Sequence, residues 1–198
     1  MNAPVDTELL NRAERQADVV RALSAALPPH ALLWQTEDTV PYECDGLTAY
    51  RQRPLVVALP ETPEQVQAVL KACHALGVPV VARGAGTGLS GGAMPHALGV
   101  TLSLAKFNKI LKLDKFSRTA VVQCGVRNLA ISEAAAPLGL YYAPDPSSQI
   151  ACTIGGNVAE NSGGVHCLKY GLTLHNVLKV RGFTIEGEPV EFGGDALD

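Results

Sequence analysis

Apolar positions in the first thirty residues recur every three or four residues, separated by charged and polar ones. This period predicts an amphipathic helix that stops at Pro28 and Pro29, because proline cannot continue it. The apolar positions are Leu10, Ala13, Ala17, Val20, Leu23 and Leu27. The polar stretch that follows has no period and contains Pro41 and Gly46, so we expect an irregular surface loop there. Residues 1–52 are therefore interpreted as an N-terminal helical arm and loop.

From residue 53 the pattern becomes strand, helix, strand. The apolar run "PLVVAL" (54–59) is typical of a buried strand. "TPEQVQAVLKACHALG" (62–77) then has apolar residues on one helical face, with Thr62 as N-cap, Pro63 in the first turn and Gly77 at the stop. "VPVVARG" (78–84) is the second strand. The order predicts a right-handed βαβ unit with parallel strands.

A second group of elements begins at about Leu111. "RTAVVQCG" (118–125) predicts a strand and "VRNLAISEAAAPLG" (126–139) a helix that Gly139 ends. "VLKVRGFTIEGEPVEFGGDALD" (177–198) predicts two strands joined by a turn at Gly187. The expected fold is thus α+β, with a parallel βαβ lobe over about residues 53–106 and a mostly antiparallel lobe after it. We assign residues 53–198 to this one domain.

Composition narrows the class of protein. The chain has 198 residues, of which 47% are hydrophobic and 18% charged, as in compact globular proteins. A net charge of -3 without a basic stripe argues against nucleic acid as a partner. No apolar run approaches the roughly 20 residues that cross a bilayer, and the N-terminus lacks the order of a secretory signal, so we expect a cytoplasmic protein without a transmembrane segment. Five scattered cysteines without a C-x-x-C pair predict reduced thiols and no metal site.

The segment "ARGAGTGLSGGA" (82–93) follows the second strand and holds five glycines. Gly86, Gly88 and Gly91 have the spacing of a dinucleotide fingerprint. A Rossmann loop, however, opens a helix and is followed about 20 residues later by an acid. Here another strand follows and no acid occurs before Asp114, and no Gly-Lys-Ser/Thr completes a phosphate-binding P-loop. Two interpretations remain open for this segment alone: a nest of backbone amides that binds an anion, or a flexible strand connection.

A second glycine-rich segment, "PDPSSQIACTIGGNVAENSGG" (144–164), surrounds its glycines with short polar side chains. Its prolines favour extended backbone, and Ser, Thr and Asn supply donors and acceptors. Two such segments are expected where one long ligand lies against the backbone. The alternative is that these residues only close turns.

Together, "RGAGTGLSGGA" and "PDPSSQIACTIGGNVAENSGGVHCLKYGLT" closely resemble the PCMH-type FAD-binding domain of the FAD-linked oxidase superfamily, whose fold is of the vanillyl-alcohol-oxidase type. Within it, the chain is most similar to the flavin subunits of bacterial glycolate oxidases, over nearly its whole length. The resemblance implies FAD as cofactor. It implies that the first segment holds the pyrophosphate through Gly84, Ala85, Gly86, Thr87, Gly88, Leu89 and Ser90. The second would lie along the ribityl chain and flavin ring, through Pro144, Ser147, Ser148, Thr153, Gly155, Gly156, Asn157, Asn161, Gly163, Gly164 and Gly171.

Relatives that attach FAD covalently through the first segment have a histidine where this chain has Thr87, so the resemblance implies non-covalent FAD. Cys152 is interpreted as a small packed residue and not as a thioether donor. His96, His166 and His175 are interpreted as structural, because none has a partner carboxylate at a readable spacing. We therefore assign no catalytic residue.

The implied activity is oxidation of glycolate to glyoxylate by hydride transfer to flavin N5 in the full-length protein, with electrons passing to a carrier. One alternative is a D-lactate dehydrogenase of the same family. Another, of a different class, is a non-redox module that binds a nucleotide or phosphate. Family members continue into a part that binds the 2-hydroxy acid, so this chain is expected to be an N-terminal portion that is incomplete and inactive alone. Other glycolate oxidase subunits are the expected partners, and would place the protein peripheral to the inner membrane.

Overall fold

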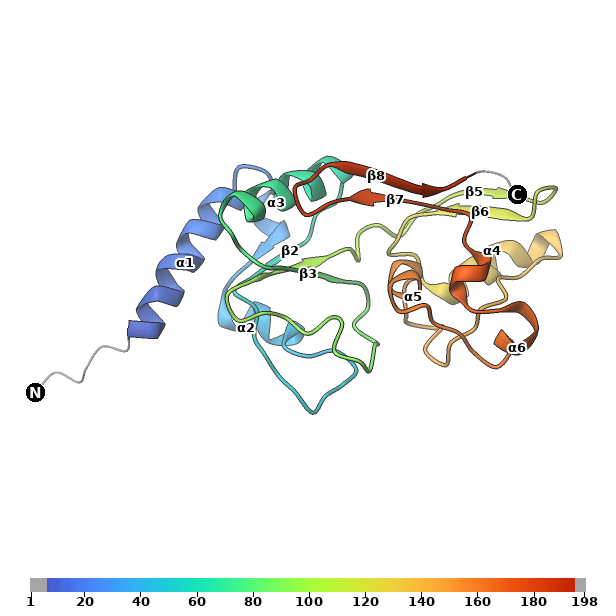
Figure 1. Cartoon of the computed structure of the whole chain (residues 1–198), viewed down its shortest axis with the longest axis horizontal. Coiled ribbons are helices and arrows are strands. Elements are labelled where there is room, and N and C mark those ends of the chain that lie inside the picture. Colours follow the sequence, from blue (N-terminus) through green and yellow to red (C-terminus); the bar gives the residue numbers. More distant parts are fainter. Residues whose placement is uncertain (1–6, 195–198) are drawn as a thin grey trace, which may run out of the picture.

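The computed structural model describes residues 7–194, which form two lobes side by side (Figure 1). The first lobe is built on a four-stranded sheet in the order β1-β2-β4-β3. Its strands are β1 (Leu32–Leu33), β2 (Val56–Ala58), β3 (Val80–Arg83) and β4 (Val100–Ser103). Strands β2 and β3 both run parallel to β4, whereas β1 runs antiparallel to β2. The predicted parallel βαβ unit is present, but its two strands are not neighbours, because the fully buried β4 lies between them.

Helix α3 (Pro63–Ala75) connects β2 to β3 and has the predicted ends. The Thr62 hydroxyl accepts a hydrogen bond from the backbone N–H of Gln65 at 3.3 Å, and Pro63 occupies the first helical position. Gly77 follows the helix with a φ of +59°, a conformation that glycine adopts without strain. Val69 and Cys73 on the inner face are buried in the first core.

The N-terminal arm contributes to that same core. Helix α1 (Thr7–Leu23) ends earlier than predicted, and a turn leads from it to the prolines. Val19, Leu23 and Leu27 are buried against β2 and α3. The side chain of Leu10 and the terminal residues 1–6 and 195–198, which our expectations also covered, lie outside the part that the structure describes. The stretch expected to be an irregular loop contains only short turns, α2 (Thr36–Thr39) and the 3-10 turn Val40–Tyr42.

The second lobe is mostly antiparallel, as predicted. Its strands form two separate pairs, β5 (Ile110–Asp114) with β6 (Thr119–Val122) and β7 (Lys179–Phe183) with β8 (Pro189–Gly193). Helix α4 (Asn128–Ala135) and the 3-10 turn Ala136–Leu138 replace the single predicted helix. Gly139 ends this turn with a φ of +72°, and Gly187 has a φ of +79° in the closing hairpin. A small core is centred on Val126, Ile131 and Ile154.

Besides α2, two more short helices were not predicted. Helix α5 (Ile154–Glu160) lies within the second glycine-rich segment, and α6 (Cys167–Tyr170) follows it. The helical conformation prevails in α5, despite two glycines, because Ile154 and Asn157 are buried on its inner face. A Cβ atom on Gly155 would lie 2.8 Å from the Cβ of Cys124, so the close packing of α5 against the preceding turn requires this glycine.

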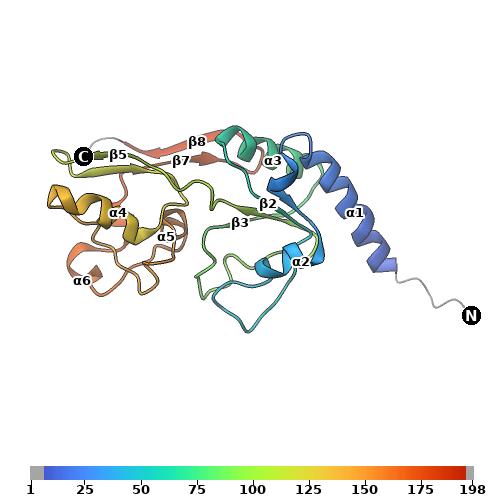
Figure 2. The same cartoon turned by 180° about the vertical axis from the view of Figure 1, so that it is seen from behind.

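The β7–β8 hairpin joins the two lobes. In both views it runs from the second lobe, beside β5 and β6, to α3 of the first lobe (Figures 1 and 2). At its tip, the side-chain amide of Gln67 donates to the carbonyl of Gly187 at 2.7 Å. Phe183 packs against the first core. Among the residues described, no helix is both long and apolar enough to cross a membrane.

Candidate cofactor site

A cavity of about 520 Å³ opens where the first glycine segment faces the second lobe. Gly84 and Ala85 form one wall. The opposite wall comes from the turn into α4 and the residues before α5. The lining residues are Gly84, Ala85, Ala105, Asn108, Ile110, Gly125, Val126, Arg127, Ala130, Ala151 and Thr153. Most of this surface is small or apolar, with a few polar groups, as in many ligand sites.

Gly84 and Thr153, which both line this cavity, are in close contact. A Cβ atom on Gly84 would overlap the Thr153 hydroxyl oxygen, so only glycine fits. Thr153 precedes α5 and is 7% exposed, but its hydroxyl does not cap the helix and has no partner among the described residues. A buried hydroxyl without a partner costs free energy, so this oxygen is left unsatisfied at the point where the two glycine-rich segments meet.

The backbone amides of the first segment are also available. From Ala85 to Ala93, no backbone N–H donates a hydrogen bond to any residue that the structure describes. Gly86 and Gly91 have φ values of +69° and +80°, which turn the chain sharply within the segment. A run of unpaired amides in a tightly turned loop is the arrangement that binds anions such as phosphate.

The N-terminal loop supports this segment from behind. A Cβ atom on Gly46 would lie 2.7 Å from the carbonyl oxygen of Thr87. The Arg83 guanidinium donates to the carbonyl of Cys44 at 2.8 Å and lies 5.6 Å from the centre of the Tyr42 ring. The N-terminal loop therefore fixes the shape of the first glycine segment, a role that its irregular sequence did not predict.

On the open side of the segment lies a carboxylate. A Cβ atom on Gly92 would lie 2.6 Å from the Oε1 atom of Glu160, at the end of α5. The corresponding distance from Gly88 is 3.6 Å. Glu160 thus places a negative charge beside the unpaired amides.

The structure brings only part of the predicted set together at the cavity. Gly84, Ala85 and Thr153 line it, and residues 86–90 continue the same loop. Gly156 lies close to Thr153, because its Cβ atom would be 3.5 Å from the hydroxyl oxygen. The amide nitrogen of Asn157 is buried and has no partner among the described residues.

The other predicted residues of the second segment contact the chain itself. A Cβ atom on Gly163 would overlap Leu172, and one on Gly164 would overlap the backbone of Asp145. The Asn161 side chain accepts from the N–H of Leu174 at 3.0 Å. The remaining members occupy turns: the carbonyls of Pro144 and Ser148 accept hydrogen bonds, Ser147 lies in a turn, and Gly171 ends α6 with a φ of +78°.

Several lining residues were missed by the sequence analysis. Asn108 and Arg127 are the polar ones. Arg127 precedes α4, donates to the carbonyl of Ile150 at 3.1 Å and pairs with Glu133 at 3.6 Å. The turn between β6 and α4, which "CGVRN" marks in the sequence, was a usable signal, since ligands gather where strands pass into helices.

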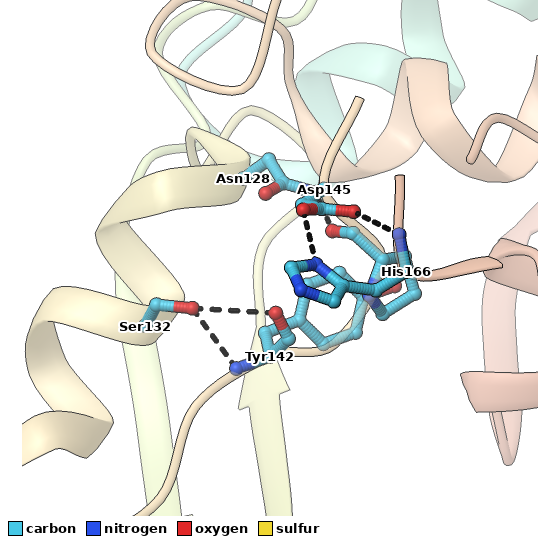
Figure 3. Close-up of polar contacts among 6 residues, drawn as sticks. Asn128, Ser132, Tyr142, Asp145 and His166 are labelled. Carbon is cyan, nitrogen blue, oxygen red and sulfur yellow. Dashed lines mark hydrogen bonds and ion pairs between the residues drawn. The ribbon is translucent and has the colours of Figure 1, made fainter. Parts of the chain in front are cut away.

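The three histidines differ in their partners. The ring nitrogens of His96 and His175 accept from the N–H groups of Leu98 and Leu172, which makes both part of local turns. His166 has a partner carboxylate after all, because its Nδ1 atom lies 2.6 Å from Oδ2 of Asp145, 21 residues away (Figure 3). Cys152 is buried, as predicted.

The site fits a long anionic ligand such as FAD. Unpaired amides suit its pyrophosphate, and the buried hydroxyl of Thr153 beside them has no partner among the described residues. The backbone at Gly84 lies so close to Thr153 that a Cβ atom on Gly84 would overlap the Thr153 side chain. No group of three or more His, Cys, Asp or Glu that could hold a metal occurs within residues 7–194.

Comparisons with known proteins identify the family of this chain. A family model described as an FAD binding domain matches residues 54–193. The glycolate oxidase subunit GlcD of Escherichia coli K12 is 61% identical over 183 residues, which cover 92% of this chain and 37% of that protein. A D-lactate dehydrogenase of Anaerostipes hadrus is 38% identical over 84% of this chain and 35% of its own length. The chain thus spans about a third of the length of these curated relatives.

A solved structure, alkyldihydroxyacetonephosphate synthase, shares the fold with a TM-score of 0.77 and 23% identity, over 88% of this chain and 34% of that one. The expected PCMH-type fold is therefore confirmed.

Proposed function

This chain belongs to the FAD binding domain family, and we propose that it forms the FAD-binding part of an oxidoreductase whose substrate is a small 2-hydroxy acid, glycolate. The observation that carries this proposal is the cavity where the unpaired amides of the first glycine segment meet the partnerless hydroxyl of Thr153. When bound, FAD supplies an acceptor for the hydride that leaves the α-carbon of the substrate.

The residues of the first segment hold the pyrophosphate. Residues 84–90 contribute backbone N–H groups, which need no compensating cation because several of them converge on one anion. Thr153 adds its hydroxyl from the opposite wall. The second segment, 144–164, with Gly171, lies along the ribityl chain and the flavin ring. In that role Asn157 supplies its unpaired amide nitrogen.

FAD is held without a covalent bond. Thr87 stands where the resemblance places a histidine in relatives that attach FAD covalently, and Cys152 is a buried free thiol. Binding therefore depends on the amides and on packing.

The substrate and partners follow from the relatives. The greater similarity to a glycolate oxidase subunit than to a D-lactate dehydrogenase favours glycolate. Because that relative is described as a subunit, we propose that the protein works with other subunits, in the cytoplasm and peripheral to the inner membrane. The chain covers 37% of the length of that relative, and we propose that the groups that bind and deprotonate the 2-hydroxy acid belong to the part that it does not cover.

The test uses protein expressed from the complete gene. Its absorption spectrum identifies a bound flavin, and dye reduction with an artificial electron acceptor compares glycolate with D-lactate. We expect bound FAD and a higher kcat/KM for glycolate. A higher kcat/KM for D-lactate would mean that D-lactate, and not glycolate, is the substrate. Binding of nucleotides without any flavin would favour the non-redox module.

A further inference from the structure

Helix α4 holds the backbone of residues 142–144 at two points. The buried amide of Asn128 donates to the carbonyl of Pro144 at 3.0 Å. One turn later, the Ser132 hydroxyl accepts from the N–H of Tyr142 at 2.9 Å and lies 3.4 Å from its carbonyl oxygen (Figure 3). Because both anchors are on one helix, the residue that follows Pro144 has a fixed position.

That residue, Asp145, holds His166 in two ways. Its Oδ2 atom lies 2.6 Å from Nδ1 of the imidazole, and its Oδ1 atom accepts the backbone N–H of His166 at 3.3 Å. Gly164 packs closely on the backbone of Asp145, because a Cβ atom on this glycine would overlap the Asp145 carbonyl group. The side chain of Asp145 is only 16% exposed. The orientation of the His166 ring is therefore set by its neighbours.

The other side of the ring is open. The Nε2 atom of His166 has no hydrogen-bond partner among the described residues, and the side chain is 54% exposed. The nearest ring is that of Tyr170, whose centre lies 6.4 Å away, and Lys169 places its ammonium 5.0 Å from the centre of the Tyr170 ring. A histidine that is fixed through one nitrogen and open at the other has the arrangement of a residue that meets a ligand.

We propose that His166, oriented by Asp145, binds the flavin half of FAD through its Nε2 atom. The inference rests on the proposed function, which places Pro144 and Ser147 around Asp145, and Gly163 and Gly164 before His166, along the flavin. The polar edge of a flavin ring presents both an N–H donor and carbonyl acceptors. Nε2 therefore finds a partner whether it accepts or donates. Asp145 is the positioning residue, because it acts only through the imidazole.

The experiment separates the two halves of FAD. Protein from the complete gene is freed of flavin and titrated by calorimetry with FAD and with ADP, which lacks the flavin. We expect His166→Ala to weaken FAD about tenfold, as for the loss of one hydrogen bond, and to leave ADP within about twofold. Asp145→Asn should show the same selectivity with a smaller loss. His30→Gln is the matched control, since it breaks another histidine–carboxylate pair, to Glu61 at 3.6 Å.

A second measurement needs no variant. The imidazole resonances of His166 in the ¹⁵N-labelled wild-type protein should shift when FAD is added and stay in place when ADP is added. If a variant fails to fold, these resonance shifts still show whether His166 contacts the flavin half of FAD. Equal losses for FAD and ADP, or no loss for either, would show that the pair only supports the fold. Failure of the wild-type protein to bind FAD would instead overturn the proposed function.

Discussion

Gly84 and Thr153 lie far apart in the sequence, yet a side chain on the first would overlap the hydroxyl of the second. This approach brings the two glycine-rich segments together at one cavity. It makes Gly84→Ala costly, because the new methyl group has to displace a buried, β-branched side chain. We expect a loss of about 1–3 kcal/mol in the free energy of unfolding.

The same contact predicts a rescue. In the absence of the hydroxyl, the nearest atom to a Cβ on Gly84 is the Thr153 Cβ at 3.5 Å, an ordinary contact. The double variant Gly84→Ala with Thr153→Ala should therefore be more stable than the sum of the single changes implies, by at least about 1 kcal/mol. Urea unfolding of the four proteins measures this coupling. Strict additivity would mean that the two residues do not meet.

Gly86→Val should weaken FAD binding. Gly86 has a φ of +69°, and its Cβ atom would overlap the Arg83 guanidinium, so valine distorts the loop that presents the amides. We expect at least a tenfold loss, about 1.4 kcal/mol, in a fluorescence titration. Gly182→Val in β7 is the control, since no atom lies within 4 Å of its Cβ position. A fully flavinated Gly86→Val protein contradicts the assignment of this loop.

Acid precipitation of the holoprotein should leave all the flavin in solution. Denaturation releases a cofactor that is held by hydrogen bonds and packing, whereas a covalent flavin stays in the pellet. Absorbance near the flavin maximum, measured in the supernatant and in the redissolved pellet, shows how the flavin divides between them. Colour in the pellet would identify an attachment site, and a Cys152→Ala variant would then show whether this thiol forms it.

Removal of the charge on Glu160 should strengthen FAD binding. The carboxylate lies beside Gly88 and Gly92, where it repels a bound pyrophosphate. Glu160→Gln is expected to lower the Kd about two- to fivefold at low ionic strength, and the effect should shrink in salt because the site is exposed. Glu14→Gln changes the net charge equally at an exposed position on α1, which packs on α3 and β2. An equal gain in both variants would exclude a local effect.

Acid should break the Asp145–His166 pair. Burial raises the pKa of Asp145, but hydrogen bonds from the ring and the backbone N–H of His166 lower the pKa by more, so that it lies below its usual range. A carboxylate with a lowered pKa stabilises the fold above the ordinary Asp pKa, about 3.9, and loses that contribution as pH falls through the folded value. In the His166→Gln variant, the free energy of unfolding should therefore fall less steeply below about pH 4 than it does in the wild-type protein. Parallel urea midpoints for both proteins down to pH 3 would contradict this.

Local signals in the sequence predicted the elements that depend on local chemistry. Thr62 and Gly77 delimit α3 because capping and left-handed backbone are decided within a few residues. Gly187 marked its turn for the same reason. The two glycine-rich segments were recognisable because close backbone approaches and left-handed backbone require glycine, as at Gly84 and Gly86.

The features that the sequence did not predict depend on contacts between residues far apart in the chain. Helix α5 forms through the burial of Ile154 and Asn157 against residues that no local window contains. The place of β4 in the middle of the sheet is a matter of topology. Likewise, Asp145 and His166 are 21 residues apart, and neither position has a spacing that predicts the other.

The hairpin of β7 and β8 also sets an order of events during synthesis. A ribosome makes the first lobe, the glycine segments and α4 to α6 before it makes the strands that connect the second lobe to α3. Until Phe183 reaches the first core and Gly187 reaches Gln67, these contacts do not tie the two lobes together. We therefore expect the cofactor site to reach its final rigidity only after the last of these strands has been translated.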